Sequence, residues 1–243
     1  MLRGLILLLL ASAIFCLSGV SFAAQIGDIA AALDKASSKD DIIRQVAQLE
    51  SLIKTSPSQK VYQQLGRALY LLGEGEGDKN RKLEYLKKSF DASEKALKEN
   101  PGDAVSLYWK AMALLQEADS VGGLKALSDV KEALRDLETV SVREPDYDYA
   151  GAYRSRGKVL IDAPGWSFIG DKKKGLELLQ KAKEIAPENL VNRLYLAQAY
   201  LKNGMKDKAQ AELGFIVAAP ARKGDKDAAD TKAQAAKLLK EAR

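Results

Sequence analysis

The chain has 243 residues with a formal net charge of +5, no histidine and one cysteine, Cys16. Ser-His-Asp catalysis is therefore excluded, and after residue 16 so are Cys-His catalysis and Cys/His zinc sites. Acidic and basic residues are mixed along the sequence, unlike the basic stripe of a nucleic-acid-binding protein, so we expect no nucleic-acid partner.

Residues 1–23 predict a secretory signal peptide. Arg3 precedes an apolar run from Leu5 to Leu17, and the small residues Ser21 and Ala23 precede the expected cleavage site. Removal of this segment would leave a periplasmic chain of charge +4 with no membrane span.

Two alternatives to cleavage stay open. Gly4–Ala24 carries no charge, and a membrane span needs roughly 20 apolar residues, so an uncleaved anchor is one of them. Lipidation at Cys16 is the other; it is disfavoured because Phe15 stands where a lipoprotein signal has a small residue.

The remainder predicts an all-α protein. Ala, Leu, Lys, Glu and Gln dominate, glycine and proline separate the periodic segments, and β-branched alternation is absent. The predicted helices cover Ile29–Lys35, Asp40–Lys54, Gln59–Leu72, Arg81–Glu99, Ala104–Ala118, Gly123–Val140, Tyr147–Ile161, Lys172–Ile185, Leu190–Asn203, Lys206–Val217 and Ala228–Ala242.

Four prolines mark a repeat of these helices. Pro101, Pro145, Pro187 and Pro220 each follow a similar helix, at spacings of 44, 42 and 33 residues. The tetratricopeptide repeat (TPR), a pair of antiparallel helices, has about 34 residues, so the earlier units carry longer turns. We predict N-terminal helices over residues 24–57, a TPR-like α-solenoid over 58–220 and a C-terminal capping helix over 221–243.

The first helix of each predicted pair carries a small residue where the two helices must approach closely. These residues are Gly66, Ala111, Gly157 and Ala197. A TPR groove is lined by the first helices, and residues three before, one after and four after a given position share a helix face. The predicted groove residues are Gln63, Arg67 and Tyr70, then Tyr108, Met112 and Leu115, then Arg154, Lys158 and Ile161, then Leu194, Gln198 and Leu201.

This face would suit a peptide with an acidic terminus or an amphiphile with an anionic head, because it combines positive and apolar side chains. The positive patch comprises Arg67, Arg154 and Lys158, and the apolar strip comprises Tyr108, Met112, Leu194 and Leu201. The alternative is that Tyr108 and Met112 belong to the core between repeats while Arg154 and Lys158 form a solvated face.

Acidic residues outside this face favour structural interpretations. The turn Gly73–Asp78 is predicted to be a solvated loop, because it lacks the ligand spacing of an EF-hand calcium site. Asp146 and Asp148 lie at a predicted helix start, where acids cap free amides, so we expect no active site there. In the turn Asp162–Ser167, Trp166 is expected to cover the hydrophobic seam or to lie near a groove.

Several segments together resemble the T component of tripartite ATP-independent periplasmic (TRAP) transporters, from about Ala104 to the C-terminus. The segments are LYWKAMALL, EPDYDYAGAYRSRGKVLIDAPGW, GDKKKGLELLQKAKEIAPENLVNRLYLAQAY and the ending AAPARKGDKDAADTKAQAAKLLKEA. The most specific points are Tyr108-Trp109, Pro145-Asp146-Tyr147, Gly151-Ala152, Pro164-Gly165 and Gly170-Asp171. The resemblance implies an all-α periplasmic protein beside a solute-binding protein, with a cavity for an apolar ligand; Phe15 departs from the lipoprotein-like start of many members.

These observations predict a non-enzymatic exported scaffold without metal or cofactor. Its expected partner is a protein, such as a periplasmic solute-binding protein of a TRAP-type system, or a small amphiphilic molecule. The alternative is a cell-envelope assembly or protein-interaction adaptor unrelated to transport.

Overall fold

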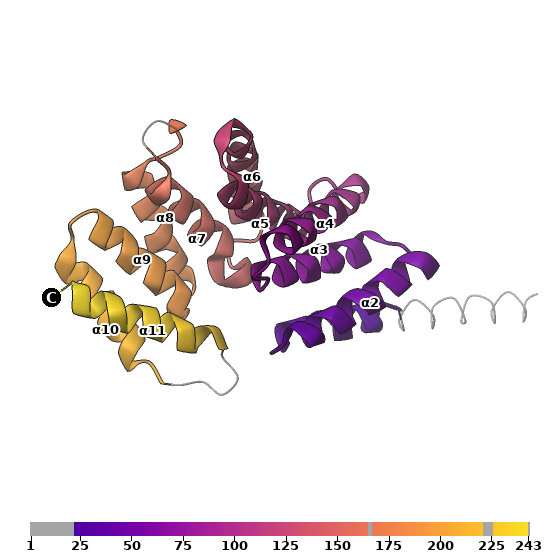
Figure 1. Ribbon diagram of the computed structural model, residues 1–243, viewed down its shortest axis with the longest axis horizontal. Helices are drawn as coiled ribbons and strands as arrows, with labels where there is room; N and C mark the ends of the chain where they lie inside the picture. The colour runs from indigo at the N-terminus through magenta and orange to yellow at the C-terminus, as the bar shows by residue number, and fades with distance from the viewer. Residues whose placement is uncertain (1–21, 165–166, 221–225, 243) are drawn as a thin grey trace, which may run out of the picture. The chain divides into compact units, whose positions relative to one another are not determined.

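The computed structural model describes residues 22–164, 167–220 and 226–242, and every regular element in these ranges is helical (Figure 1). The predicted cleavage region up to Ser21 and the predicted role of Trp166 lie outside the described residues. None of the helices within the described ranges combines the length and the apolar character that crossing a bilayer demands.

The all-α prediction is confirmed, and most helix ends lie within a few residues of their predicted positions. Residues 22–34 are helical and start several residues before the helix predicted there. The other helices are α2 (Lys39–Thr55), α3 (Gln59–Glu74), α4 (Lys79–Glu99), α5 (Ala104–Val121), α6 (Gly123–Arg143), α7 (Tyr147–Asp162), α8 (Lys172–Ile185), α9 (Leu190–Lys202), α10 (Lys206–Ala218) and α11 (Lys226–Glu241).

Neighbouring helices pack as successive pairs: α3 with α4, α5 with α6, α7 with α8, and α9 with α10 (Figure 1). Helix α2 packs on α3, and α11 packs on α9 and α10. The chain forms two compact units, Met1–Pro101 and Gly102–Arg243.

Small residues allow the close approach of paired helices, as the sequence predicts. In the first unit, a Cβ added to Gly66 of α3 would lie 2.5 Å from the Ser93 hydroxyl oxygen on α4. In the second unit, a Cβ on Gly157 of α7 would lie 2.7 Å from Leu179 and 2.9 Å from the Gly175 carbonyl oxygen on α8. A larger side chain at either position would push the paired helices apart.

Side-chain caps set most helix starts in both units. The carboxylates of Asp103 and Asp171 accept from the amides of Ser106 and Lys174, at 2.8 and 2.9 Å. Each cap satisfies an amide that has no partner within its own helix. Local sequence therefore determines where these helices begin.

In the acidic turn Gly73–Asp78, the residues Glu74, Gly75, Gly77 and Asp78 are exposed as predicted for a solvated loop, but Glu76 is not. The Glu76 side chain is 5% exposed and accepts from Lys39 at 2.5 Å, with Arg81 at 3.4 Å. The hydrogen bond from Lys39 lowers the pKa of Glu76 to about 2. The solvated-loop prediction failed for Glu76 because its cationic partner comes from α2, 37 residues away in the sequence.

The start of α7 also differs from prediction. Asp148, Tyr149 and Ala150 have φ angles of 49°, 55° and 63°, in the left-handed region. Asp146 makes no capping hydrogen bond with its side chain, and Asp148 binds tertiary partners instead. The predicted capping role was therefore wrong, because this left-handed turn breaks the helical geometry that capping requires.

Candidate functional site

The buried end of the contact between α7 and α9 is centred on Arg154. Its side chain is 12% exposed, and its Nη2 donates to the Asp148 carboxylate at 2.6 Å. Its Nη1 donates to the Asp148 carbonyl and to the Asn192 side-chain oxygen, both at 3.1 Å. Burial opposes the positive charge, but Tyr108 and Asp148 outweigh it, so the pKa of Arg154 lies above its usual value.

Residues of α5, α7, α8 and α9 hold this end together. The Tyr108 hydroxyl on α5 donates to Asp148 on α7 at 2.5 Å. The buried Asn192 amide on α9 donates to the carbonyl oxygens of Tyr149 at 2.8 Å and Ala182 at 3.0 Å. These bonds stabilise the left-handed turn, whose non-glycine residues each cost roughly 1–2 kcal/mol of conformational energy. The network is therefore part of the structure that supports the predicted groove face, and most of its polar groups already bind one another rather than a ligand.

Aromatic side chains surround the same turn. Tyr108 packs edge-on against Trp109 and Tyr147, with ring centroids 5.0 and 5.2 Å apart, and the Trp109 indole N–H donates to the Tyr147 hydroxyl at 2.9 Å. A Cβ on Gly151 would collide with the Tyr108 hydroxyl. The resemblance singled out these positions, and the structure shows that they form one packing unit.

The opposite end of the α7–α9 contact is open to solvent. The Asp162 carboxylate accepts from Lys158 of α7 and from Lys202 of α9, at 2.5 Å each. The three side chains are 35%, 44% and 52% exposed, respectively. The Lys158 ammonium also lies 5.5 Å from the ring centroid of Tyr195.

These contacts shift both titrating groups. Partial burial raises the pKa of Asp162, but the hydrogen bonds from Lys158 and Lys202 outweigh it, and the net pKa is below its usual value. Partial burial likewise opposes the charge of Lys158, but the hydrogen bond to Asp162 raises its pKa above the usual value. Asp162 and Lys158 are therefore both charged near neutral pH.

The twelve predicted groove residues fall in both units. Gln63, Arg67 and Tyr70 lie on α3 of the first unit, and the others lie on α5, α7 and α9 of the second. The buried members are Gln63, Tyr70, Tyr108, Ile161 and Leu194, and the half-buried members are Arg67, Met112, Leu115, Arg154, Lys158, Gln198 and Leu201. Their contact with a partner stays a prediction.

Several of these residues have structural contacts that the sequence left open. Leu194 packs against Leu213 and Ile216 in the core formed with α10 and α11. Ile161 packs against Leu179 and Tyr200. The Ser155 hydroxyl donates to the Met112 sulfur at 3.3 Å, which joins α5 to α7.

The predicted positive patch is neutralised by acidic partners. Arg67 pairs with Asp34 in the first unit, and Arg154 pairs with Asp148 in the second. Lys158 pairs with Asp162. The sequence placed these cations on the predicted face, and the structure adds that each has an acidic partner from a turn or a helix end.

Asp162, Tyr195 and Lys202 also belong to this contact and were not among the predicted groove residues. Gln198 and Lys202 follow Tyr195 by three and seven residues, so the three side chains share one face of α9. Extension of the predicted face by one turn would have found Lys202. Asp162 is the last residue of α7, and its role follows only from the proximity of α9.

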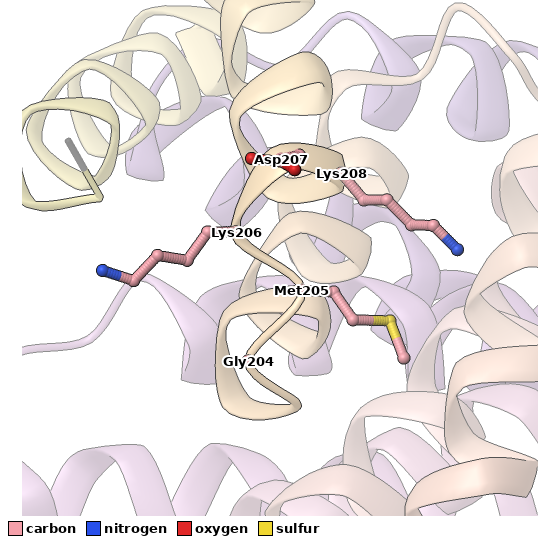
Figure 2. A pocket seen from close by; sticks show the side chains of 5 residues that line it. All are labelled: Gly204, Met205, Lys206, Asp207 and Lys208. Carbon is pink, nitrogen blue, oxygen red and sulfur yellow. The ribbon is translucent and has the colours of Figure 1, made fainter.

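Two hollows are lined by residues outside this contact. One, of about 420 Å³, is lined by five consecutive residues, Gly204 to Lys208, at the turn between α9 and α10. Figure 2 shows the Lys206 and Lys208 side chains pointing in opposite directions, so they do not converge on a common point. This hollow lacks the convergent polar groups of a ligand site.

The other hollow, of about 270 Å³, lies in the first unit between α2 and α4. Its apolar lining includes Ile53, Leu65 and Leu69, and charged residues form much of the rest. The Lys95 ammonium on its edge lies 5.5 Å from the ring centroid of Tyr62. An apolar lining with a few polar groups is typical of small-molecule sites.

Comparison with known proteins supports the fold. No protein-family profile and no curated protein sequence matches the chain. Its structure is similar to TTC0263, a thermophilic TPR protein of Thermus thermophilus, with 17% identity, 82% of this chain and 91% of that chain covered, and a TM-score of 0.61.

A double mutant of MamA, described as RS-1 ArsTM, is similar at 21% identity, covers 79% of this chain and 90% of its own, and has a TM-score of 0.50. At these identities the similarity concerns the fold alone. Together with the paired helices, it shows that the chain has the TPR fold, a helical-repeat architecture.

Proposed function

We propose that the protein is a non-enzymatic scaffold that binds a protein partner on its second unit. The proposed surface, the α7–α9 face, comprises Lys158 and Asp162 of α7 with Tyr195, Gln198 and Lys202 of α9. One observation carries the proposal: exposed or half-buried side chains of α7 and α9, the first helices of neighbouring repeats, contact one another directly. Lys202 donates to Asp162, and Lys158 lies beside the ring of Tyr195.

The geometry of the contact supports this choice of face. Arg154 meets Asn192 near the starts of α7 and α9, and Asp162 meets Lys202 at their ends. The two helices therefore run side by side in the same direction, as first helices of neighbouring repeats do. The buried network at the starts holds the backbone, while exposed or half-exposed polar side chains toward the ends, those of Lys158, Asp162, Gln198 and Lys202, can reach a partner.

We further propose export to the periplasm and a role beside a TRAP-type transport system. The N-terminal pattern of Arg3, the apolar run and Ser21 and Ala23 supports export, and the resemblance from about Ala104 onward supports the transport role. A periplasmic solute-binding protein is the partner that this proposal expects. A cell-envelope assembly adaptor is the alternative, and the identity of the captured partner distinguishes the two.

Site-specific photo-crosslinking in cells tests the proposal. A photoreactive phenylalanine analogue replaces Gln198 on the α7–α9 face, and the matched control replaces Lys173, an exposed residue of α8. We expect a discrete protein adduct from position 198 and none from position 173. A solute-binding protein in the adduct would support the transport role, and an envelope-assembly protein would support the alternative. Equal adducts from both positions, or none from 198, would refute this binding face.

A small amphiphilic ligand is a second candidate, favoured by the apolar-lined hollow between α2 and α4 of the first unit. Native mass spectrometry of the exported protein would show a retained ligand as added mass. We expect Ile53→Glu, which places a charge in the lining, to abolish that added mass. Retention of the ligand by this variant would exclude the hollow as its site.

A further inference from the structure

Two cations from different helices hold one carboxylate at the exposed end of the α7–α9 face. Lys202 donates to Asp162 Oδ1 and Lys158 donates to Asp162 Oδ2, at 2.5 Å each. Each oxygen thus has its own ammonium donor. A carboxylate held through both oxygens by two cations is the arrangement with which a protein recognises an acidic group.

The acid occupies an unfavourable position on its own helix. Asp162 is the last residue of α7, and Lys202 is the last residue of α9. The C-terminal end of a helix carries partial negative charge, which favours lysine and disfavours aspartate. The two helix ends therefore suit Lys158 and Lys202 as a cationic pair, whereas Asp162 is held there chiefly by these two lysines.

The contact is also open to exchange. All three side chains are between about a third and a half exposed, so water reaches the pair from outside. Ion pairs in such surroundings contribute little net stability, because solvent solvates the separated groups well. An incoming carboxylate can therefore replace Asp162 at small cost, while Asp162 turns outward to water.

We propose that Asp162 is an internal stand-in for a partner's acidic side chain, and that an aspartate or glutamate of a bound protein segment displaces it from Lys158 and Lys202. This inference rests on the proposed function and names the chemistry of the bound segment. An aspartate or glutamate is the occupant expected, because the group that fills the position in the free protein is itself an aspartate side chain. The ring of Tyr195 beside Lys158 provides apolar surface next to the charge.

Binding of the full-length exported protein to synthetic peptide arrays tests the proposal. One set combines leucine with aspartate or glutamate, a second set replaces the acids by asparagine or glutamine, and both have amidated C-termini. A third set has the neutral sequences with free C-terminal carboxylates. The variants are Asp162→Asn, which frees the two lysines, and Lys158→Gln with Lys202→Gln, which removes them.

Asp119→Asn is the matched control. Asp119 is an exposed carboxylate of α5 that acts electrostatically on Lys158 without an ion pair to it. Its replacement changes the net charge by the same amount as Asp162→Asn. Comparison of the two variants therefore separates release of the lysines from a general change of charge. Circular dichroism confirms that each variant keeps its helical content.

We expect Asp162→Asn to raise retention of the acidic peptides about three- to tenfold, as one or two released charge-assisted hydrogen bonds allow, without a gain for neutral peptides. Asp119→Asn should change retention much less, and the double lysine variant should abolish the acidic preference. If Asp162→Asn fails to fold, the double lysine variant decides the result by itself.

Equal gains from Asp162→Asn and Asp119→Asn would overturn the proposal, as would an acidic preference that survives loss of both lysines. A gain confined to peptides with free C-termini would overturn the side-chain source. A partner adduct at position 198 without any acidic preference would leave the proposed function intact and refute only this inference.

Discussion

Asp148 and Asp162 lie at opposite ends of α7, and each is held by two donors from residues of different helices. Their side chains are about equally exposed, at 33% and 35%. Their partners differ, because Tyr108 and Arg154 are largely buried while Lys158 and Lys202 are half-exposed. The comparison teaches that burial of the partner decides whether a carboxylate supports the structure or is free to exchange.

Loss of the Asp148 charge should have the largest effect. Asp148→Asn keeps the shape and tolerates the left-handed backbone, but it leaves the buried Arg154 without its counter-ion. We expect a loss of about 2–4 kcal/mol in the free energy of unfolding, measured by urea denaturation followed by circular dichroism. A loss below the effect of Asp162→Asn would contradict the structural role assigned to Arg154.

Closure of the space beside Tyr108 should have the next largest effect. Gly151→Ala would place a methyl group against the Tyr108 hydroxyl and the Asp148 carboxylate, which are both in contact with the turn. We expect a loss of about 1–3 kcal/mol in the same denaturation experiment. Gly214→Ala in α10 is the control, because an added Cβ meets nothing within 4 Å there; it should be neutral or slightly stabilising.

The carboxylate of Glu76, in the first unit, is also held by a cation, and its contribution to stability can be measured through its dependence on pH. The folded protein holds the pKa of Glu76 at about 2, below its ordinary value of 4.5. A lowered pKa means that this contribution to stability is present above about pH 4.5 and is lost as the pH falls toward 2. The free energy of unfolding of Glu76→Gln should therefore lie below that of the native protein above about pH 4.5, and the two should converge as the pH falls toward 2. Denaturation at a series of pH values measures both.

The control for this experiment is Asp40→Asn, an exposed residue of α2. It makes the same carboxylate-to-amide change at an exposed position, and we expect the larger pH-dependent change from Glu76→Gln because Lys39 holds the Glu76 carboxylate. Parallel pH profiles for the native protein and Glu76→Gln would show that Lys39 does not hold the Glu76 charge.

The smallest effect on stability is expected from Asp162→Asn. Its lysine partners are exposed, so loss of the pair should cost at most about 1 kcal/mol. The same denaturation experiment measures it beside Asp148→Asn. A cost as large as that of Asp148→Asn would show that the exposed pair is structural, and it would remove the basis for its exchange with a partner.

Much of the fold could be predicted from sequence because the relevant interactions are local. Asp103 and Asp171 cap helices that begin beside them, and small residues such as Gly66 and Gly157 mark where paired helices approach. The face of α7 that carries Arg154 and Lys158 also follows from helical periodicity. The charge of that face could not be predicted, because Asp148 and Asp162 reach it through a left-handed turn and a helix end.

The sequence by itself determined an all-α chain of paired helices, since capping, periodicity and small residues act within a few turns of one chain segment. Only the tertiary structure decided which charges are paired. Glu76 meets Lys39, Tyr108 meets Asp148, and Asp162 meets Lys202, across separations of 37 to 40 residues. Coulomb interactions depend on distance in space and on the surrounding medium, and both are set by how the helices pack.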